Sequence, residues 1–267
     1  MAIALDSCGY SLRALAGRPA RHGVENGDEL QQLPPTDLIL ITTPDDAIAE
    51  VAQRLAVCET ERRRKPTVLH TSGALSSEVL SPLAQLGFHT GSLHPLVSIS
   101  EPRAGAKALR GAFYCLEGDK TALRIARLIV GDLKGKGFSI RPESKALYHA
   151  AAVMASPHLV ALFDLATEML AACGINQKSA RQILLPLVAS TVNNLLVFTP
   201  DKALTGTFTR GDVATVRRHL KALKTPSLKQ LAIALEVYKL LGLHSLELAE
   251  RNGLDPKLSE EIRNLLL

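Results

Sequence analysis

Short apolar runs alternate with amphipathic stretches between residues 10 and 140. The run Asp37–Thr42 is continuously apolar after its first residue, which is typical of a strand buried in a parallel sheet. Strands that alternate with helices predict βαβ units and a mostly parallel sheet. The expected strands cover residues 10–16, 37–42, 67–70, 90–94, 112–117 and 138–141, and the expected helices cover residues 45–56, 77–86 and 119–133.

The pattern changes after Pro142, where helical spacing replaces the alternation and no further strand is expected. Helices are predicted over residues 143–173, 178–196, 212–224, 227–242 and 259–267. The sequence therefore predicts an α/β, Rossmann-like parallel-sheet domain over residues 1–141, followed by an all-helical domain over residues 142–267. Residues 151–169 and 184–196 carry more apolar side chains than one face of a small helical domain buries, which predicts a homodimer through that domain.

The apolar segments and the cysteines of the sequence indicate the compartment of the protein. No apolar run is expected to cross a bilayer, and no basic segment followed by an apolar one marks an export signal. The four cysteines are far apart and fit no zinc or redox spacing, so no metal site is expected. Scattered, reduced thiols favour a cytoplasmic protein.

The net charge of +5 raises the question of a polyanionic partner. The densest basic run, residues 62–65, fits a solvated loop between a helix and a strand. Binding to single-stranded nucleic acid needs aromatic stacking platforms, but only 4% of residues are aromatic and none is Trp. Neither a nucleic-acid partner nor a membrane partner is therefore predicted.

Polar residues follow three of the expected strands, and ligands bind at the carboxyl ends of strands in open α/β sheets. Thr42, Thr43 and Pro44 follow the first, with Asp45 as a possible helix cap. Ser72 and Gly73 follow the second, and His94 ends the third. Each position also fits an ordinary strand-to-helix turn, and a single histidine is more often structural than a ligand.

Two further groups lie in the helical part. Lys145 and His149 are four residues apart and share a helix face, which Ser156 continues. A glycine-bracketed loop holds Thr205, Arg210 and Asp212, and an arginine there is able to grip a carboxylate. The alternatives are a solvated lysine, a core histidine, a surface arginine and an aspartate that caps the next helix.

Taken together, these motifs resemble those of bacterial predicted oxidoreductases with a Rossmann-like domain and a C-terminal helical domain of unknown function. The resemblance rests on five segments in this order: TTPDDAI (42–48), LHTSGALSSEVL (69–80), GSLHPL (91–96), KALYHAAAVMAS (145–156) and ALTGTFTRGD (203–212). That family is similar to ketopantoate reductases, pyrroline-5-carboxylate reductases and β-hydroxyacid dehydrogenases. The helical domain is expected to be of the 6-phosphogluconate-dehydrogenase C-terminal type.

The resemblance implies an NAD(P)H-dependent reductase of a small carbonyl or imine acid. It assigns Lys145 as proton donor and His149 as its partner, and places the nicotinamide near Thr43 and Pro44. Substrate contacts are expected from Ser72, Gly73, His94, Ser156, Thr205, Arg210 and Asp212. Arg18 and Arg21 follow the strand over residues 10–16, where a cation favours the 2′-phosphate of NADP over NAD.

Three departures from the family pattern bear on this reading. The chain has no strand with a G-x-G-x-x-G turn near its start, and residues 1–5 fit the end of the helix that normally follows that turn. Pro157 follows Ser156 where the family has Asn, and Thr207 stands where the family has Pro. The start is therefore truncated or miscalled, or the protein binds dinucleotides poorly. A non-catalytic binding or scaffold protein with the same fold is the alternative function.

Overall fold

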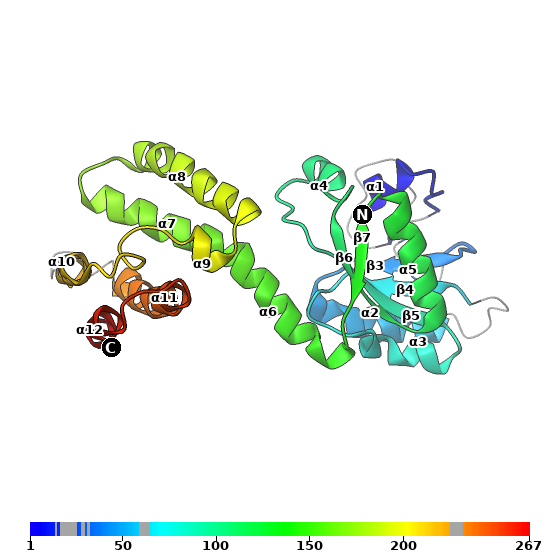
Figure 1. Ribbon diagram of the computed structural model, residues 1–267. Coiled ribbons are helices and arrows are strands. Elements are labelled where there is room, and N and C mark those ends of the chain that lie inside the picture. Colours follow the sequence, from blue (N-terminus) through cyan, green and yellow to red (C-terminus); the bar gives the residue numbers. More distant parts are fainter. Residues whose placement is uncertain (14, 17–25, 28–29, 31–32, 59–64, 225–231) are drawn as a thin grey trace. The chain divides into compact units, whose positions relative to one another are not determined.

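The computed structural model describes residues 1–13, 15–16, 26–27, 30, 33–58, 65–224 and 232–267. Contacts divide the chain into two compact units, residues 1–156 and 157–267, and each is described by itself. The first unit is a sheet with helices on its faces, and the second unit is helical (Figure 1). The predicted fold class, a Rossmann-like sheet domain followed by a helical region, is confirmed.

Five strands form the main sheet in sequential order. The first three are parallel, β6 runs antiparallel to β5, and β7 is parallel to β6. The strands are β3 (Leu38–Ile41), β4 (Thr67–His70), β5 (His89–Pro95), β6 (Phe113–Gly118) and β7 (Lys136–Ser139). Two short strands, β1 (Leu15–Ala16) and β2 (Asn26–Gly27), pair in parallel as a separate sheet.

One face of the sheet is covered by α5 (Lys120–Asp132), which contacts β4 to β7. Its apolar residues Ala122, Ala126 and Ile129 recur at helical spacing and are buried against the sheet. Asp119 begins this helix by accepting hydrogen bonds from two backbone amides of its first turn. The short helices α1 (Ala2–Asp6) and α4 (Pro102–Ala108) contact each other, and α1 packs into the same core.

The other face has two parts. Beside β3 and β4 it is apolar and packs against α2 (Asp45–Cys58), the 3₁₀ helix η2 (Ser77–Leu80) and α3 (Ser81–Gln85). Beside β5 and β6 the same face is polar, and the first turns of α6 (Lys145–Ala155) lie against it. A second 3₁₀ helix, η3 (Pro142–Ser144), leads into α6.

Two glycines permit the close approach of β5 and β6. Gly91 pairs with Gly118, whose φ of +141° is rare for any residue with a side chain. A Cβ atom added to Gly118 would lie 2.5 Å from the Cα of Gly91. A Cβ added to Gly91 would lie 2.9 Å from the carbonyl oxygen of Glu117. Neither position has room for a side chain.

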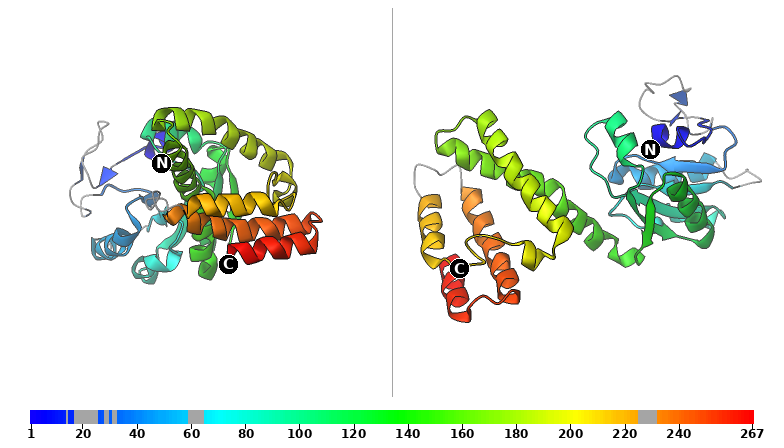
Figure 2. Two further views of the ribbon diagram at one scale, coloured as in Figure 1. Left: turned by 90° about the vertical axis from the view of Figure 1, so that its left-hand side faces the viewer. Right: turned by 45° about the horizontal axis from the view of Figure 1, so that its top comes forward.

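In the second unit, α7 and α8 lie side by side, while α10, α11 and α12 share a small core (Figure 2). That core contains Val216, Leu220, Leu246, Ile262 and Leu266. The helices are α7 (Pro157–Ala172), α8 (Gln177–Val197), α9 (Pro200–Ala203), α10 (Val213–Leu223), α11 (Ala232–Arg251) and α12 (Pro256–Leu266).

The single helix predicted over residues 143–173 is wrong, because the structure divides it at Ser156. Ser156 leaves the helical conformation at φ −128° and ψ −74°. Pro157 has no backbone N–H to continue the hydrogen-bond ladder, so it begins α7 instead. The sequence pattern changes at residue 142, whereas the contacts change after residue 156, so α6 packs with the first unit.

Smaller differences concern the ends of elements. Residues 10–13 of the predicted first strand have no regular structure, and only residues 15–16 pair as a strand. The last helix begins at Pro256, three residues before its predicted start, because Asp255 caps it. Helix α11 extends to Arg251, well beyond the expected end at residue 242.

Two helical stretches, Pro142–Ala172 and Gln177–Val197, are long and apolar enough to span a membrane by length and composition. Their mean hydropathy is 1.4 and 1.2, and 6% of each apolar window is buried. This corrects the expectation that no stretch reaches that length, because a helix with few charges qualifies without an unbroken apolar run. One or two such helices are weak evidence, and the absence of a membrane partner stays a prediction.

Candidate functional site

Pairing between strands gathers five polar side chains on one face of the sheet. In the parallel pair His70 lies opposite Ser92, and in the antiparallel pair Ser92 lies opposite Glu117 and His94 opposite Cys115. Residues opposite each other in a sheet project from the same face. Four of the five are less than 9% exposed, and His94 is half-buried.

Lys145, the first residue of α6, inserts its side chain into this polar layer. Its Nζ donates hydrogen bonds to the carbonyl oxygen of Ser72, at 3.1 Å, and to Ser92 Oγ, at 2.9 Å. The residue is only 1% exposed. Burial lowers the pKa of this amine from its ordinary value, while the negative charges of nearby acidic groups act in the opposite direction.

One helical turn later, Tyr148 contacts the same layer. Its Oη lies 2.7 Å from His94 Nδ1, and its ring packs edge-to-face against His94 and Phe138. Burial and the neighbouring Lys145 charge lower the pKa of His94 to about 4, so His94 is neutral at pH 7. Burial also raises the pKa of the Tyr148 hydroxyl.

Gly73 lies where two histidines meet. A Cβ atom at this position would be 2.5 Å from His149 Cδ2 and 2.8 Å from His94 Nε2. The rings of His94 and His149 have centroids 5.9 Å apart. The structure therefore brings the predicted residues Gly73, His94, Lys145 and His149 into one cluster, although the hydrogen bonds of Lys145 go to Ser72 and Ser92 rather than to His149.

The loop after β4 is held by its own hydrogen bonds. Ser72 Oγ donates to Asp45 Oδ2 at 2.8 Å and accepts from the backbone amides of Ala74 and Leu75. These bonds use the donor and both acceptor sites of the hydroxyl. Ser72 therefore acts within this structure as a loop-forming residue, and the Asp45 carboxylate joins that loop to the start of α2.

The structure describes three of the five predicted cofactor residues. Thr42, Thr43 and Pro44 follow β3 as expected and are exposed. Arg18 and Arg21 lie outside the described residues. Asp45 was expected as a possible cap of α2, but it is the first residue of the helix and accepts a hydrogen bond from Ser72.

The predicted residues of the loop after α9 belong to the second unit. Asp212 caps α10 by accepting hydrogen bonds from the backbone amide of Thr215, at 3.0 Å, and from its hydroxyl, at 2.7 Å. These bonds lower the pKa of Asp212. Arg210 and Thr205 are exposed, and Ser156 forms the C-terminal cap of α6 at the end of the first unit.

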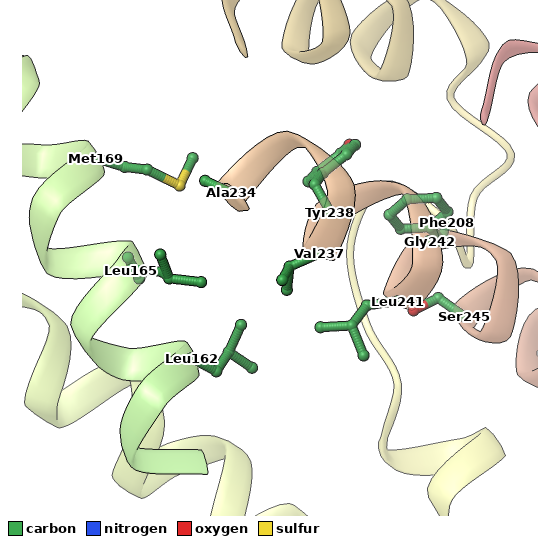
Figure 3. Close-up of a pocket in the computed structure, with 11 residues that line it drawn as sticks. Leu162, Leu165, Met169, Phe208, Ala234, Val237, Tyr238, Leu241, Gly242 and Ser245 are labelled. Atoms are coloured by element: carbon green, nitrogen blue, oxygen red, sulfur yellow. The ribbon is translucent and has the colours of Figure 1, made fainter. Parts of the chain in front are cut away.

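The second unit also contains an apolar cavity of about 150 Å³ that sequence reasoning missed. Figure 3 shows leucine and methionine side chains of α7 facing residues of α11 across this space. Its lining includes Leu162, Leu165, Met169, Phe208 and Tyr238. Among the described residues that line it, none is charged, and the polar side chains are those of Tyr238 and Ser245.

Five residues of the cluster were assigned no role from the sequence: His70, Ser92, Tyr148, Cys115 and Glu117. One signal was available for Ser92, because Ser92 and His94 are polar at alternate positions of a strand and so share a face. Cys115 and Glu117 show the same alternation on the next strand. Their convergence depends on strand register, which a single sequence does not give.

Comparison with known proteins decides the family. A Rossmann-like domain model matches residues 27–95, and a model named domain of unknown function DUF2520 matches residues 112–245, half of the chain. The chain belongs to the DUF2520 family. No curated protein matches it.

Several solved structures share the fold of this DUF2520 chain. A protein of Thermotoga maritima is 25% identical with a TM-score of 0.68, and the match covers 83% of this chain and 82% of that one. A candidate NADP oxidoreductase of Bacteroides fragilis is 20% identical with a TM-score of 0.70, covering 91% and 92%. The pyrroline carboxylate reductase of Plasmodium falciparum, solved with NADP, is 10% identical with a TM-score of 0.55, covering 99% and 92%.

Proposed function

We propose that this DUF2520 protein is an NAD(P)H-dependent reductase of a small carbonyl or imine acid. The observation that carries the proposal is the buried ammonium of Lys145, held beside two histidines and a tyrosine on the sheet face below α6. Perturbed, buried titratable groups gathered in one place are typical of catalytic sites. The shared fold with NADP oxidoreductases supports the same reaction class.

We propose NADP as the cofactor, with NAD as the alternative. Exposed hydroxyls at Thr42 and Thr43, after a parallel strand, fit a ribose or the nicotinamide amide. The first turn of α2 carries Asp45 and Asp46, whose negative charges disfavour a phosphate there. An imine reductase of Myxococcus stipitatus with a TM-score of 0.50 was solved with NADP⁺, and Arg18 and Arg21 supply cations for a 2′-phosphate.

The bound cofactor would supply hydride to the substrate carbon. Lys145 would supply the matching proton at Nζ, because burial lowers its pKa toward working pH. His149 and His94 would orient the substrate above Gly73, and Ser156 remains a proposed substrate contact. Ser72 would act by holding its loop in place. Arg210 and Thr205 lie in the second unit, where their roles as substrate contacts stay predictions from the sequence, and Asp212 would hold its loop there.

We also propose a cytoplasmic homodimer that forms through the second unit. The cysteines in the structure are free thiols, which fits a reducing compartment. Side chains on α7 and α8 such as Val160, Leu187 and Leu196 are 64–79% exposed, and exposed apolar surface of this kind usually meets a partner.

A non-catalytic binding protein is the second candidate, because a shared fold does not by itself imply a shared activity. Titration with NADPH and NADH, followed by assay of NADPH consumption with cyclic imine acids and 2-keto acids, separates the two. The proposal expects NADPH to bind more tightly than NADH and to be consumed with one substrate class. Binding without consumption supports the second candidate, and no binding of either cofactor at millimolar concentration contradicts the reductase.

A further inference from the structure

His70 ends β4 and is completely buried below the loop that leads to η2. Its Nδ1 lies 3.2 Å from the backbone nitrogen of Ser72, and its Nε2 lies 3.2 Å from the carbonyl oxygen of Ser76. A backbone N–H only donates, so Nδ1 must carry the lone pair. A carbonyl only accepts, so Nε2 must carry the hydrogen. The two contacts together select the neutral imidazole with its proton on Nε2.

The loop between these two contacts carries the central features of the site. The Ser72 carbonyl accepts a hydrogen bond from Lys145, and Gly73 lies against His94 and His149. Ser77 is the residue that follows the loop. Its backbone amide, at 2.7 Å, and its hydroxyl both donate hydrogen bonds to the buried Glu117 carboxylate of β6. The loop is therefore fixed from the sheet at both ends, by His70 and by Glu117.

We propose that His70 is a positioning residue that holds loop 71–76 in the conformation that gives Lys145 its acceptor and places Gly73 against the two histidines. The part of this inference that concerns turnover rests on the proposed reductase function. Its structural part is independent of any activity, because it depends only on the two imidazole contacts.

Burial and the Lys145 charge lower the pKa of His70 to about 4, which keeps the ring neutral at pH 7. The hydrogen bond to Ser76 and the charge of Asp45 act in the opposite direction. A proton on Nδ1 would point toward the N–H of Ser72, so two donors would face each other. The charged ring is therefore incompatible with this conformation of the loop. The geometry and the direction of this pKa agree.

The test compares three variants of the full chain. His70→Leu removes both hydrogen bonds and fills a similar volume with an apolar side chain. His70→Asn keeps an acceptor near the position of Nδ1. His89→Leu is the matched control, since His89 lies at the start of β5, half-exposed, 3.3 Å from Asp119 and outside the cluster.

Two readouts do not require activity. Nitrogen NMR of the wild-type chain should show His70 as the neutral Nε2–H form at pH 7. Hydrogen exchange at the Ser72 amide should quicken at least tenfold in His70→Leu, return toward the wild-type rate in His70→Asn and stay unchanged in His89→Leu. An Nδ1–H or charged ring, or unchanged Ser72 exchange in a folded His70→Leu chain, overturns the inference.

The third readout is turnover. Misplacement of a catalytic group by about 1 Å is able to cost about a hundredfold in rate, so His70→Leu should lower kcat roughly tenfold to a hundredfold with little change in the KM for NADPH. His70→Asn should recover part of kcat, which a loss of general stability would not explain. If the wild-type chain turns over no substrate, the proposed function fails, while the NMR and exchange results still decide the role of His70.

Discussion

Helices α5 and α8 are both rich in apolar residues, but they use them in opposite ways. In α5 the buried residues recur at helical spacing on one side, against the sheet. In α8 only Ala180 is buried, while Ile183 and Leu187 are 54% and 64% exposed. A helix that is apolar on all sides is normally covered on all sides. The apolar side of α5 is therefore covered within the first unit, whereas α8 in the second unit leaves apolar side chains exposed, as the proposed homodimer requires.

The largest expected effect tests whether the chemistry lies in the first unit. Lys145→Ala removes the buried ammonium and should lower turnover by about 10² to 10⁴, with NADPH affinity nearly unchanged, because general acids contribute about that factor. Lys178→Ala changes an exposed lysine of α8 and is the matched control. Steady-state kinetics with NADPH measures both. Normal turnover of the Lys145 variant would show that the proton comes from another group.

Core packing gives the next contrast between the units. Leu93 is 0% exposed in the sheet core, and Leu93→Ala should lower the free energy of unfolding by about 2–5 kcal/mol. Leu196 is 79% exposed, so Leu196→Ala should change the stability of an isolated chain by less than about 0.5 kcal/mol. Chemical denaturation measures both values.

Leu196→Glu sharpens the same contrast. If a second copy covers α8, this charge should shift the molar mass in light scattering from dimer toward monomer at micromolar concentration. A wild-type chain that is already monomeric at this concentration would contradict the proposed homodimer.

Stability should fall in acid because of the first unit. An unfolded histidine has a pKa of about 6.5, and that of His70 is lowered to about 4 by folding. Between these values the unfolded chain binds more protons, so stability rises with pH from 4 to 6.5 and is fully present above 6.5. The span is on the order of 3 kcal/mol for His70. Denaturation at several pH values should show this slope in wild type and a smaller one in His70→Leu; equal slopes would contradict it.

Loss of a helix cap is expected to have the same effect in both units. Asp119 caps α5 by accepting hydrogen bonds from two backbone amides of its first turn, and Asp212 caps α10 by accepting one from the backbone amide of Thr215. Asp119→Ala and Asp212→Ala should each cost about 1 kcal/mol of unfolding free energy. A much larger effect on substrate KM from Asp212→Ala would show that this residue also serves the site.

The sequence predicted most strands and helices because their apolar residues follow clear periods, as in β4 and α5. It also placed Gly73, His94, Lys145 and His149 among the site residues, since each follows a strand or shares a helix face. It could not show that Lys145 bonds to Ser72 and Ser92, because those contacts depend on strand register and on the angle of α6. Pro157 is a signal for the break at Ser156. The helical period of the apolar residues continues on both sides of it, and for that reason the pattern predicted one uninterrupted helix.

Gly91 and Gly118 limit which substitutions this sheet tolerates during evolution. Each lacks room for a methyl group, and the obstacle includes the backbone of the opposite strand rather than only a movable side chain. A substitution at one position therefore finds no single compensating exchange at the other. In a library of all single substitutions, almost no substitution should be tolerated at these two sites. The exposed positions of α8 should accept many substitutions unless a second chain packs on them. If the proposed second copy packs on α8, the mutational map would show it as exposed positions at which substitutions are no longer tolerated.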